Sequence, residues 1–463
     1  MDFNGASPFP EGVISFLDTD LYKLTMQCAV LKFFPDVSVT YAFTNRTPEK
    51  KLSRAAFKWL NAQIHKLGNI ALSTDEYQFL KSTCKYLNAT YLAYLKDFRL
   101  RPREQIAATF VPDDDTSSDE DQGAVKLEIK GLWVDTILYE IPLLALTSEA
   151  YFKFMDKDWV YDGQEEKAYE KGMRLLSSGC IVSEFGSRRR RDYHTQALVF
   201  RGLIKASKEG EKRGLPGKIS GTSNVHLAMR FGISPIGTVA HEWFMGVAAV
   251  TNDYERASEV ALKYWVECFG EGVLGIALTD TFGTPIFLRA FRKSIPQPAV
   301  IVRDDMETKR PKTFAQVFNG VRQDSGDPAD FVKLMREFYD KEGIADKKTI
   351  VFSDSLNIEL CIQYKKISED AGFQPSFGVG TFLTNDFVHT STGKKSVPLN
   401  IVIKLSSACG RPAIKISDNV GKNTGDQAMV AEVKKVLGYE EKSWQDGDET
   451  KRWGTENDST GES

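Results

Sequence analysis

His241 is one of only five histidines in the 463-residue chain, and it ends an apolar run in the stretch GTVAHEW, residues 237–243. An imidazole titrates near neutral pH and can act as a base, a nucleophile or a metal ligand. Zinc is disfavoured, because HEWFM lacks the second histidine of the H-E-x-x-H motif. A lone histidine is more often a hydrogen-bonded structural residue than a catalyst, so its neighbours must decide between the two interpretations.

Asp280, in the stretch TDTFGT, is a candidate partner for that histidine. A carboxylate that holds one ring nitrogen leaves the other as a nucleophile, which could accept a phosphoryl group. The sequence has no G-x-S-x-G motif and no cysteine obviously suited to pair with the histidine.

Arg322 and Asp324 lie in RQDSGDP, residues 322–328. A helix start explains Asp327 as N-cap and Pro328 as the first helical residue. It leaves Arg322 and Asp324 unexplained, since charges at the end of a buried strand need a partner or a ligand. Asp324 could bind sugar hydroxyls or a Mg²⁺-bound water, and Arg322 could contact a phosphate.

Three further stretches favour anion binding. GTSN (221–224), SDSLN (353–357) and FGVGT (377–381) combine glycines with small hydroxyl residues, so that backbone N–H groups can approach phosphate oxygens. Each is weak alone, and no GxxxxGK[ST] sequence occurs. EFGSRRRR (184–191) is mainly a solvated charge run, but Phe185 and Arg188 offer a stacking ring and an anion fork. At most about two of the four arginines can point into a cleft.

These motifs end short apolar runs that alternate with helical stretches after residue 150. Seven such units predict an α/β fold with a parallel sheet, and a barrel or near-barrel explains them better than a doubly wound sheet. Polar clusters at the carboxyl ends of the strands would then converge on one face. The units begin at Ile181, Lys218, Pro235, Gly275, Val317, Lys348 and Pro375.

The first 150 residues give mixed signals. Residues 19–35 predict a capped helix, residues 37–46 predict a strand, and two further strands flank the acidic loop 112–123. That loop is expected to be a solvated hairpin tip, and a phosphorylatable patch is the less favoured interpretation. Residues 205–217 predict a charged loop, residues 292–313 an inserted excursion, and the end from about residue 444 a loosely ordered tail.

Composition bounds the remaining possibilities. Hydrophobic residues make up 42% and charged residues 27%, and the net charge is -3, so no global field favours nucleic acid or an anionic membrane. Six scattered cysteines fit reduced thiols in a cytoplasmic or nuclear compartment. The N-terminus lacks a secretory signal, and no apolar run is long enough to span a bilayer.

Taken in order, TDLYKLTM, SEFGSRRRR, GTSN, GTVAHEW, ALTDTFGT, RQDSGDP, SDSLN, FGVGT and IKISDNVGKNTGD resemble the nicotinate phosphoribosyltransferase family, over about residues 16–453. The resemblance implies an incomplete TIM-like α/β barrel, residues 151–400, and a second α+β domain built from both chain ends. Residues 1–150 form its N-terminal part and residues 401–463 pack back on it. It also implies a homodimer with shared active sites.

The family couples ATP hydrolysis to the formation of nicotinate mononucleotide and pyrophosphate from nicotinate and phosphoribosyl pyrophosphate, the first step of NAD salvage from nicotinate. ATP would be a cosubstrate and Mg²⁺ a cofactor with unknown ligands. The resemblance makes His241 a phosphohistidine oriented by Asp280. It places nicotinate among Tyr22 of a partner subunit, Phe185, Arg188, Thr222 and Ser223, and phosphoribosyl pyrophosphate among Arg322, Asp324, Asp354, Gly378, Gly380 and Thr381.

Ser223 bears on the substrate, because nicotinamide-using relatives carry an aspartate there, and a carboxylate would repel an acid. Ser223 therefore favours nicotinate. Two alternatives stay open: a transferase that uses nicotinamide or quinolinate, and a catalytically silent nucleotide-binding sensor. His241, Arg322 and Asp324 argue against the silent protein.

Overall fold

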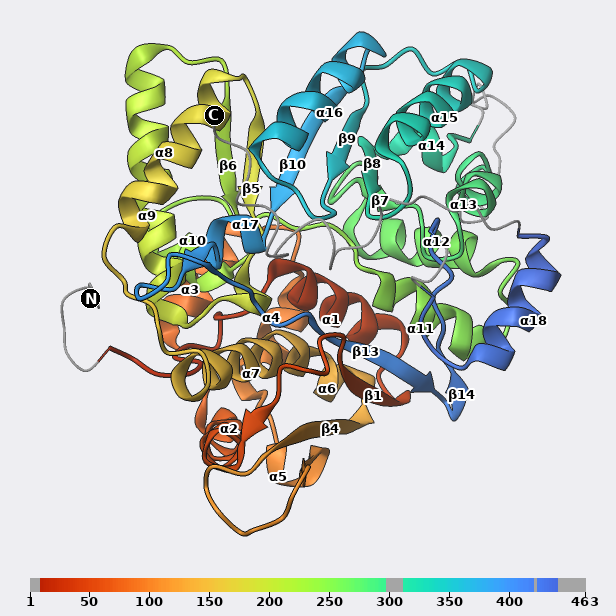
Figure 1. Ribbon diagram of the computed structural model, residues 1–463. Coiled ribbons are helices and arrows are strands. Elements are labelled where there is room, and N and C mark those ends of the chain that lie inside the picture. Colours follow the sequence, from red (N-terminus) through yellow and green to blue (C-terminus); the bar gives the residue numbers. More distant parts are fainter. Residues whose placement is uncertain (1–8, 297–310, 420–422, 440–463) are drawn as a thin grey trace.

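The computed structural model describes residues 9–296, 311–419 and 423–439. Its upper half in Figure 1 contains a parallel six-stranded sheet in the order β6-β5-β10-β9-β8-β7. The predicted α/β fold with a parallel sheet is confirmed. These strands are β5 (Ile181–Glu184), β6 (Lys218–Thr222), β7 (Ile276–Leu278), β8 (Gly320–Gln323), β9 (Thr349–Phe352) and β10 (Gln374–Val379).

Six of the seven predicted strand units form strands, and the prediction for residues 235–242 is wrong. That segment makes only an isolated parallel bridge, Pro235 with Thr222, supported by a 2.8 Å hydrogen bond from Ile236 N to Thr222 O. Pro235 has no N–H to donate, and Gly237 packs directly against the backbone of Tyr22, so the segment leaves the sheet. His241 consequently begins a helix instead of ending a strand.

Helices cover the parallel sheet and connect its strands. Helices α8 and α9 pack together beside β5 and β6 (Figure 1). The helices of this part are α8 (Gln164–Ser177), α9 (Tyr193–Arg213), α10 (Val225–Phe231), α11 (His241–Thr251), α12 (Ala257–Phe269), α13 (Thr284–Phe291), α14 (Phe314–Val317), α15 (Pro328–Lys341), α16 (Ile358–Asp370) and α17 (Thr381–Thr384).

The second sheet joins the two ends of the chain. It is antiparallel, with the order β14-β13-β1-β4-β2 and β3 paired to β4. β13 pairs with β1, so residues 401–408 complete a sheet begun by residues 38–45. Its strands are β1 (Ser38–Asn45), β2 (Leu52–Ser53), β3 (Ile106–Pro112), β4 (Gln122–Leu132), β13 (Ile401–Ala408) and β14 (Arg411–Pro412).

Helix α1 (Leu21–Phe33) lies between the two sheets in Figure 1. Its start is attached to the parallel sheet, because Leu21 N donates to Ser223 O just after β6 at 2.8 Å. The other elements are α2 (Arg54–Lys66), α3 (Thr74–Thr83), α4 (Ala89–Asp97), α5 (Pro102–Gln105), α6 (Trp133–Thr136), α7 (Glu140–Phe154), α18 (Gln427–Leu437), β11 (Phe387–Val388) and β12 (Lys395–Ser396).

The expected irregular segments have different outcomes. The acidic hairpin tip between β3 and β4 is exposed, as predicted. The charged loop predicted for residues 205–217 is wrong: residues up to Arg213 extend α9, and Gly214 ends it with a φ of 66°. Most of the excursion 292–313 and the tail from residue 444 lie outside the described residues. None of the described helices combines the length and apolar character needed to cross a bilayer.

Candidate active site

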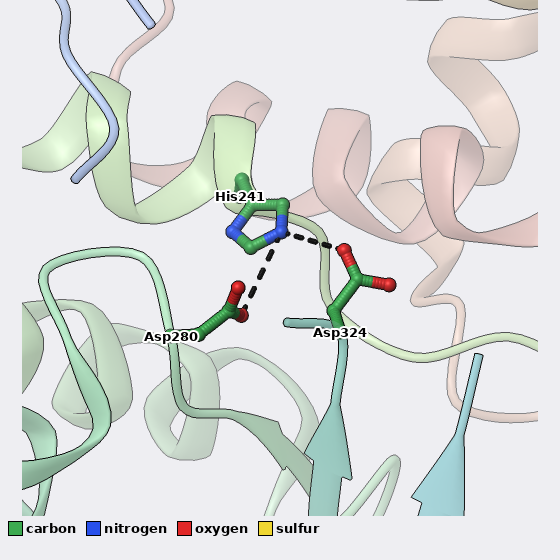
Figure 2. Close-up of side chains that lie close together, drawn as sticks. All are labelled: His241, Asp280 and Asp324. Carbon is green, nitrogen blue, oxygen red and sulfur yellow. Dashed lines mark hydrogen bonds and ion pairs between the residues drawn. The ribbon is translucent and has the colours of Figure 1, made fainter. Parts of the chain in front are cut away.

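His241 is the first residue of α11, where it meets loops that follow two neighbouring parallel strands. Asp280 follows β7 and Asp324 follows β8, and both carboxylates face the Nε2 side of the imidazole (Figure 2). Nε2 lies 3.0 Å from Asp324 Oδ2 and 3.7 Å from Asp280 Oδ1. The structure thus brings the three predicted catalytic residues together, with Asp324 as the closer carboxylate.

Two contacts complete the surroundings of the imidazole. Nδ1 lies 3.0 Å from Thr281 Oγ1, which is buried, and Lys415 Nζ lies 2.9 Å from Nε2. Lys415 can donate to Nε2 only when that nitrogen is unprotonated, whereas Asp324 accepts from it only when it is protonated. The site therefore offers Nε2 a partner in either state.

The charges around the histidine set its protonation. Burial, and next the ammonium of Lys415, hold the pKa of His241 below its ordinary value, so the ring is mostly neutral at pH 7. Burial would raise the pKa of Asp280, but Lys415 and His241 hold it below its usual range. For Asp324, Arg322 and His241 overcome burial and hold the pKa well below its usual range. Both carboxylates are ionised.

Arg322 is fixed at the end of β8 by three side chains. Its guanidinium donates to Asp324 Oδ1 at 2.8 Å, to Ser353 Oγ at 2.7 Å and to Thr238 Oγ1 at 3.1 Å. Ser353 also donates to Asp324 Oδ1 at 2.7 Å. A bidentate donor held in this way can present a defined face to a phosphate.

A pocket beside His241 is lined by three of the residues predicted to bind nicotinate, Phe185, Arg188 and Ser223. Tyr22 of the same chain also lines it, whereas the resemblance implies Tyr22 of a partner subunit at this place. The ring of Phe185 rests on Gly378, where an added Cβ would lie 2.4 Å from ring carbons. Gly378, which lies in the predicted phosphate-binding loop, thus also leaves the space that the Phe185 ring occupies.

Thr222 does not reach this pocket. Its buried hydroxyl donates to Glu184 Oε2 at 2.5 Å. Ser223 does line the pocket, but its hydroxyl donates to Asp20 Oδ1 at 2.8 Å, as does that of Ser187. Burial raises the pKa of Asp20. Thr222 and Ser223 thus each hydrogen-bond a buried carboxylate.

A second pocket adjoins the first and shares with it the residues Phe185, Arg188, His241, Arg322 and Asp324. Gly378, Gly380 and Thr381 line it as predicted, whereas Asp354 is buried and its neighbour Ser355 lines the pocket instead. Further cationic side chains that line it are Arg46, Arg189, Lys404 and Lys415. This concentration of positive charge suits a polyphosphate.

The arginine run divides in two. Arg188 and Arg189 line the second pocket, which confirms that two of the four can face a cleft. The solvated face expected for the others is wrong. Arg190 is buried in a bidentate pair with Asp18, at 2.7 and 2.6 Å, and buried Arg191 lies over the rings of Phe152 and Phe387. The second pair anchors the loop that carries the first.

Lys415 was missed by reasoning from residue types, although it lies in the C-terminal motif IKISDNVGKNTGD. It stands between buried Ile414 and Ile416, and its own side chain is only 6% exposed. A lysine inside an apolar run needs a buried anionic partner, and this signal could have singled it out. Thr281, Ser353 and Thr238 gave no such signal.

The three catalytic candidates also have the chemistry of a cation site. His241, Asp280 and Asp324 each offer a ligand atom, and these atoms lie within 4.8 Å of one another. Asp280 Oδ1 is buried and has no hydrogen-bond partner within the described part of the chain. Two ionised carboxylates fit Mg²⁺, which prefers oxygen ligands.

Comparison with known proteins agrees with this architecture. Residues 180–441 match the model of the nicotinate phosphoribosyltransferase (NAPRTase) family, and residues 17–148 match its N-terminal domain. The nicotinate phosphoribosyltransferase of Saccharomyces cerevisiae is 44% identical over 449 residues, covering 95% of this chain and 98% of the relative. That of Methanosarcina mazei is 38% identical, covering 92% and 98%.

Solved structures agree as well. A crystal structure from Saccharomyces cerevisiae, assigned as a nicotinate phosphoribosyltransferase, has a TM-score of 0.85 at 44% identity and covers 93% of this chain and 100% of its own. The fold and the pockets define an α/β protein with a cation-lined pocket beside a buried histidine. The chain belongs to the nicotinate phosphoribosyltransferase family.

Proposed function

We propose that this chain joins nicotinate to phosphoribosyl pyrophosphate and couples the transfer to ATP hydrolysis, giving nicotinate mononucleotide, pyrophosphate, ADP and phosphate. One observation carries the proposal. A pocket with two aromatic rings and Arg188 opens directly onto His241 and the Arg322–Asp324 pair, which border a second, cationic pocket. A pyridine acid and a sugar polyphosphate would meet between them.

In the first pocket, Tyr22 and Phe185 hold the pyridine ring and Arg188 binds its carboxylate. The ring nitrogen attacks C1 of the ribose while the C1–O bond to pyrophosphate breaks. The transition state at C1 is oxocarbenium-like, and Asp324 stabilises its positive charge from the end of β8. Arg322 and the loop of Gly378, Gly380 and Thr381 hold the phosphates.

His241 accepts the γ-phosphoryl group through Nε2, because Nδ1 faces the buried Thr281 hydroxyl. The Nε2 lone pair forms the N–P bond as the P–O bond to ADP breaks. Water later cleaves the N–P bond and releases phosphate. Lys415 lies 2.9 Å from Nε2, where its ammonium can neutralise the oxygens of the transferred group.

Mg²⁺ would be held by Asp280 and Asp324, and it would supply positive charge to the phosphates of ATP and to the leaving pyrophosphate. When Nε2 acts as the nucleophile it carries no proton, so Thr281 at Nδ1, and not the carboxylates, orients the ring in that state. Holding the cation requires both carboxylates to be ionised, as the surrounding cations ensure.

The finer architecture is part of the proposal. We propose that the parallel sheet is an incomplete barrel, with β6 and β7 as its two open edges. The homodimer with shared sites stays a prediction. Tyr22 and Phe185 of one chain already line one pocket, so light scattering during turnover would tell whether a partner is needed.

In the first experiment, purified protein is incubated with equimolar nicotinate and nicotinamide, Mg²⁺ and phosphoribosyl pyrophosphate, with and without ATP. We expect nicotinate mononucleotide, stimulated by ATP, together with ADP. Nicotinamide mononucleotide would contradict the assignment of substrate. Absence of any product from folded protein would favour a silent binding protein.

A further inference from the structure

Lys23 is completely buried beneath the first pocket and bridges two acids that line it. Its ammonium lies 2.5 Å from Glu140 Oε2 and also pairs closely with Glu242 Oε2. Lys23 itself does not line the pocket. A single buried cation thus compensates two carboxylates from α7 and α11.

Both acids are held in place by other groups. Glu242 Oε1 accepts from Tyr41 Oη at 2.6 Å and from Trp133 Nε1 at 2.8 Å. Glu140 lies 3.7 Å from Arg188 and 3.5 Å from Tyr22 Oη, the two residues to which we assign the nicotinate carboxylate and ring. Neither acid can turn away when an anion enters.

The charges of the first pocket make this arrangement necessary. Four acids line it, Asp20, Glu140, Glu242 and Asp324, against three cations, Arg188, Arg322 and Lys404. Asp324 is paired with Arg322 at 2.8 Å, which leaves Arg188 and Lys404 to face the other three acids. These acids would repel an anionic substrate electrostatically unless a further cation offset their charge.

We propose that Lys23 is a specificity-determining residue. It lets the pocket accept an anionic pyridine, although Lys23 itself does not contact the substrate. The inference rests on the proposed function. Lys23 offsets Glu140 and Glu242, so that the charge of Arg188 remains available to the substrate. A neutral pyridine would gain little from this compensation, so Lys23 discriminates by charge.

The test measures the KM for nicotinate and the inhibition constant of neutral nicotinamide in the wild type, Lys23→Met, Glu140→Gln and the double variant. Lys23→Met should raise the KM for nicotinate at least about tenfold, because like charges at short range in a half-buried site are costly. Glu140→Gln should lower that KM, since one repelling charge is removed. The double variant should return to within about threefold of the wild type.

The inhibition constant of nicotinamide should differ little between the wild type and the three variants. Glu140→Gln is nearly isosteric at a side chain that is 12% exposed, so it keeps the test decisive if Lys23→Met fails to fold. A raised or unchanged nicotinate KM in Glu140→Gln, or equal weakening of both pyridines in Lys23→Met, would overturn the inference. A wild type that forms no nicotinate mononucleotide would instead contradict the proposed function.

Discussion

Lys415 and His241 lie 174 residues apart in sequence, yet the lysine Nζ is 2.9 Å from the histidine Nε2. The lysine also lies 3.2 Å from Asp280 Oδ2, so it connects the histidine with the carboxylate predicted to orient it. A cation at this point keeps the imidazole neutral, and it stands where a transferred phosphoryl group would carry its negative charge. The C-terminal segment therefore contributes a residue to the centre of the site.

His241→Ala should retain weak phosphoribosyl transfer and lose the response to ATP. Removing the phosphoryl acceptor should lower the ATP-stimulated part of the rate by at least about a hundredfold. The measurement compares initial rates with and without ATP and traces ³²P from γ-labelled ATP into the protein. Equal stimulation in variant and wild type would remove this role.

Lys415→Met should change the pH dependence of ATP stimulation. Since Lys415 lowers the pKa of His241, its loss should raise that pKa, and the acid limb of the pH–rate profile should move to higher pH. Neutral imidazole would then be lost at a pH where the wild type is still active. An unshifted limb would contradict the role of the ammonium. Lys434→Met, a change on α18, serves as the control.

Arg188→Ala should raise the KM for nicotinate selectively. A charge-assisted hydrogen bond to a carboxylate contributes about 1.5–3 kcal/mol, which corresponds to roughly ten- to a hundredfold in KM. Arg189→Ala is the matched control, because Arg189 lines only the second pocket and should affect phosphoribosyl pyrophosphate. If the two variants raise the nicotinate KM equally, Arg188 does not bind the acid.

Gly378→Ala should displace the ring of Phe185, since the new methyl group would lie 2.4 Å from ring carbons. We expect a loss of about 1–3 kcal/mol in the free energy of unfolding and a higher KM for nicotinate. Chemical denaturation and steady-state kinetics check both. Adding Phe185→Leu should restore much of the stability but not the KM. If Gly378→Ala were as stable as the wild type, the contact between Gly378 and the Phe185 ring would not be tight.

Ser223→Asp should weaken the binding of nicotinate at least about tenfold relative to that of nicotinamide, because the new carboxylate would face the carboxylate of nicotinate. The structure adds a second effect. Ser223 donates to Asp20, so the substitution also sets two carboxylates against each other and should lower thermal stability. Ser223→Ala, which removes the donor without adding charge, should change the preference far less. An unaltered preference in Ser223→Asp would exclude this position as a determinant.

The sequence predicted the parallel sheet well, because strand and helix signals alternate regularly and polar residues follow each strand. It failed at residues 235–242, where apolar content suggests a strand although Pro235 lacks the N–H for continued pairing. It also missed Lys415 and the partners of Thr222 and Ser223. Those contacts join segments whose proximity depends on tertiary packing, and periodicity carries no information about it.

The pairing of β13 with β1 has a consequence for how the protein is made. Thr40 and Ser407 touch across the antiparallel sheet but are 367 residues apart. At a translation rate of about 5–20 residues per second, β1 waits on the ribosome for roughly 20–70 s before its partner is synthesised. During that time one of its edges is unpaired and open to association with other chains. The newly made chain should therefore depend on chaperones until its last strands emerge.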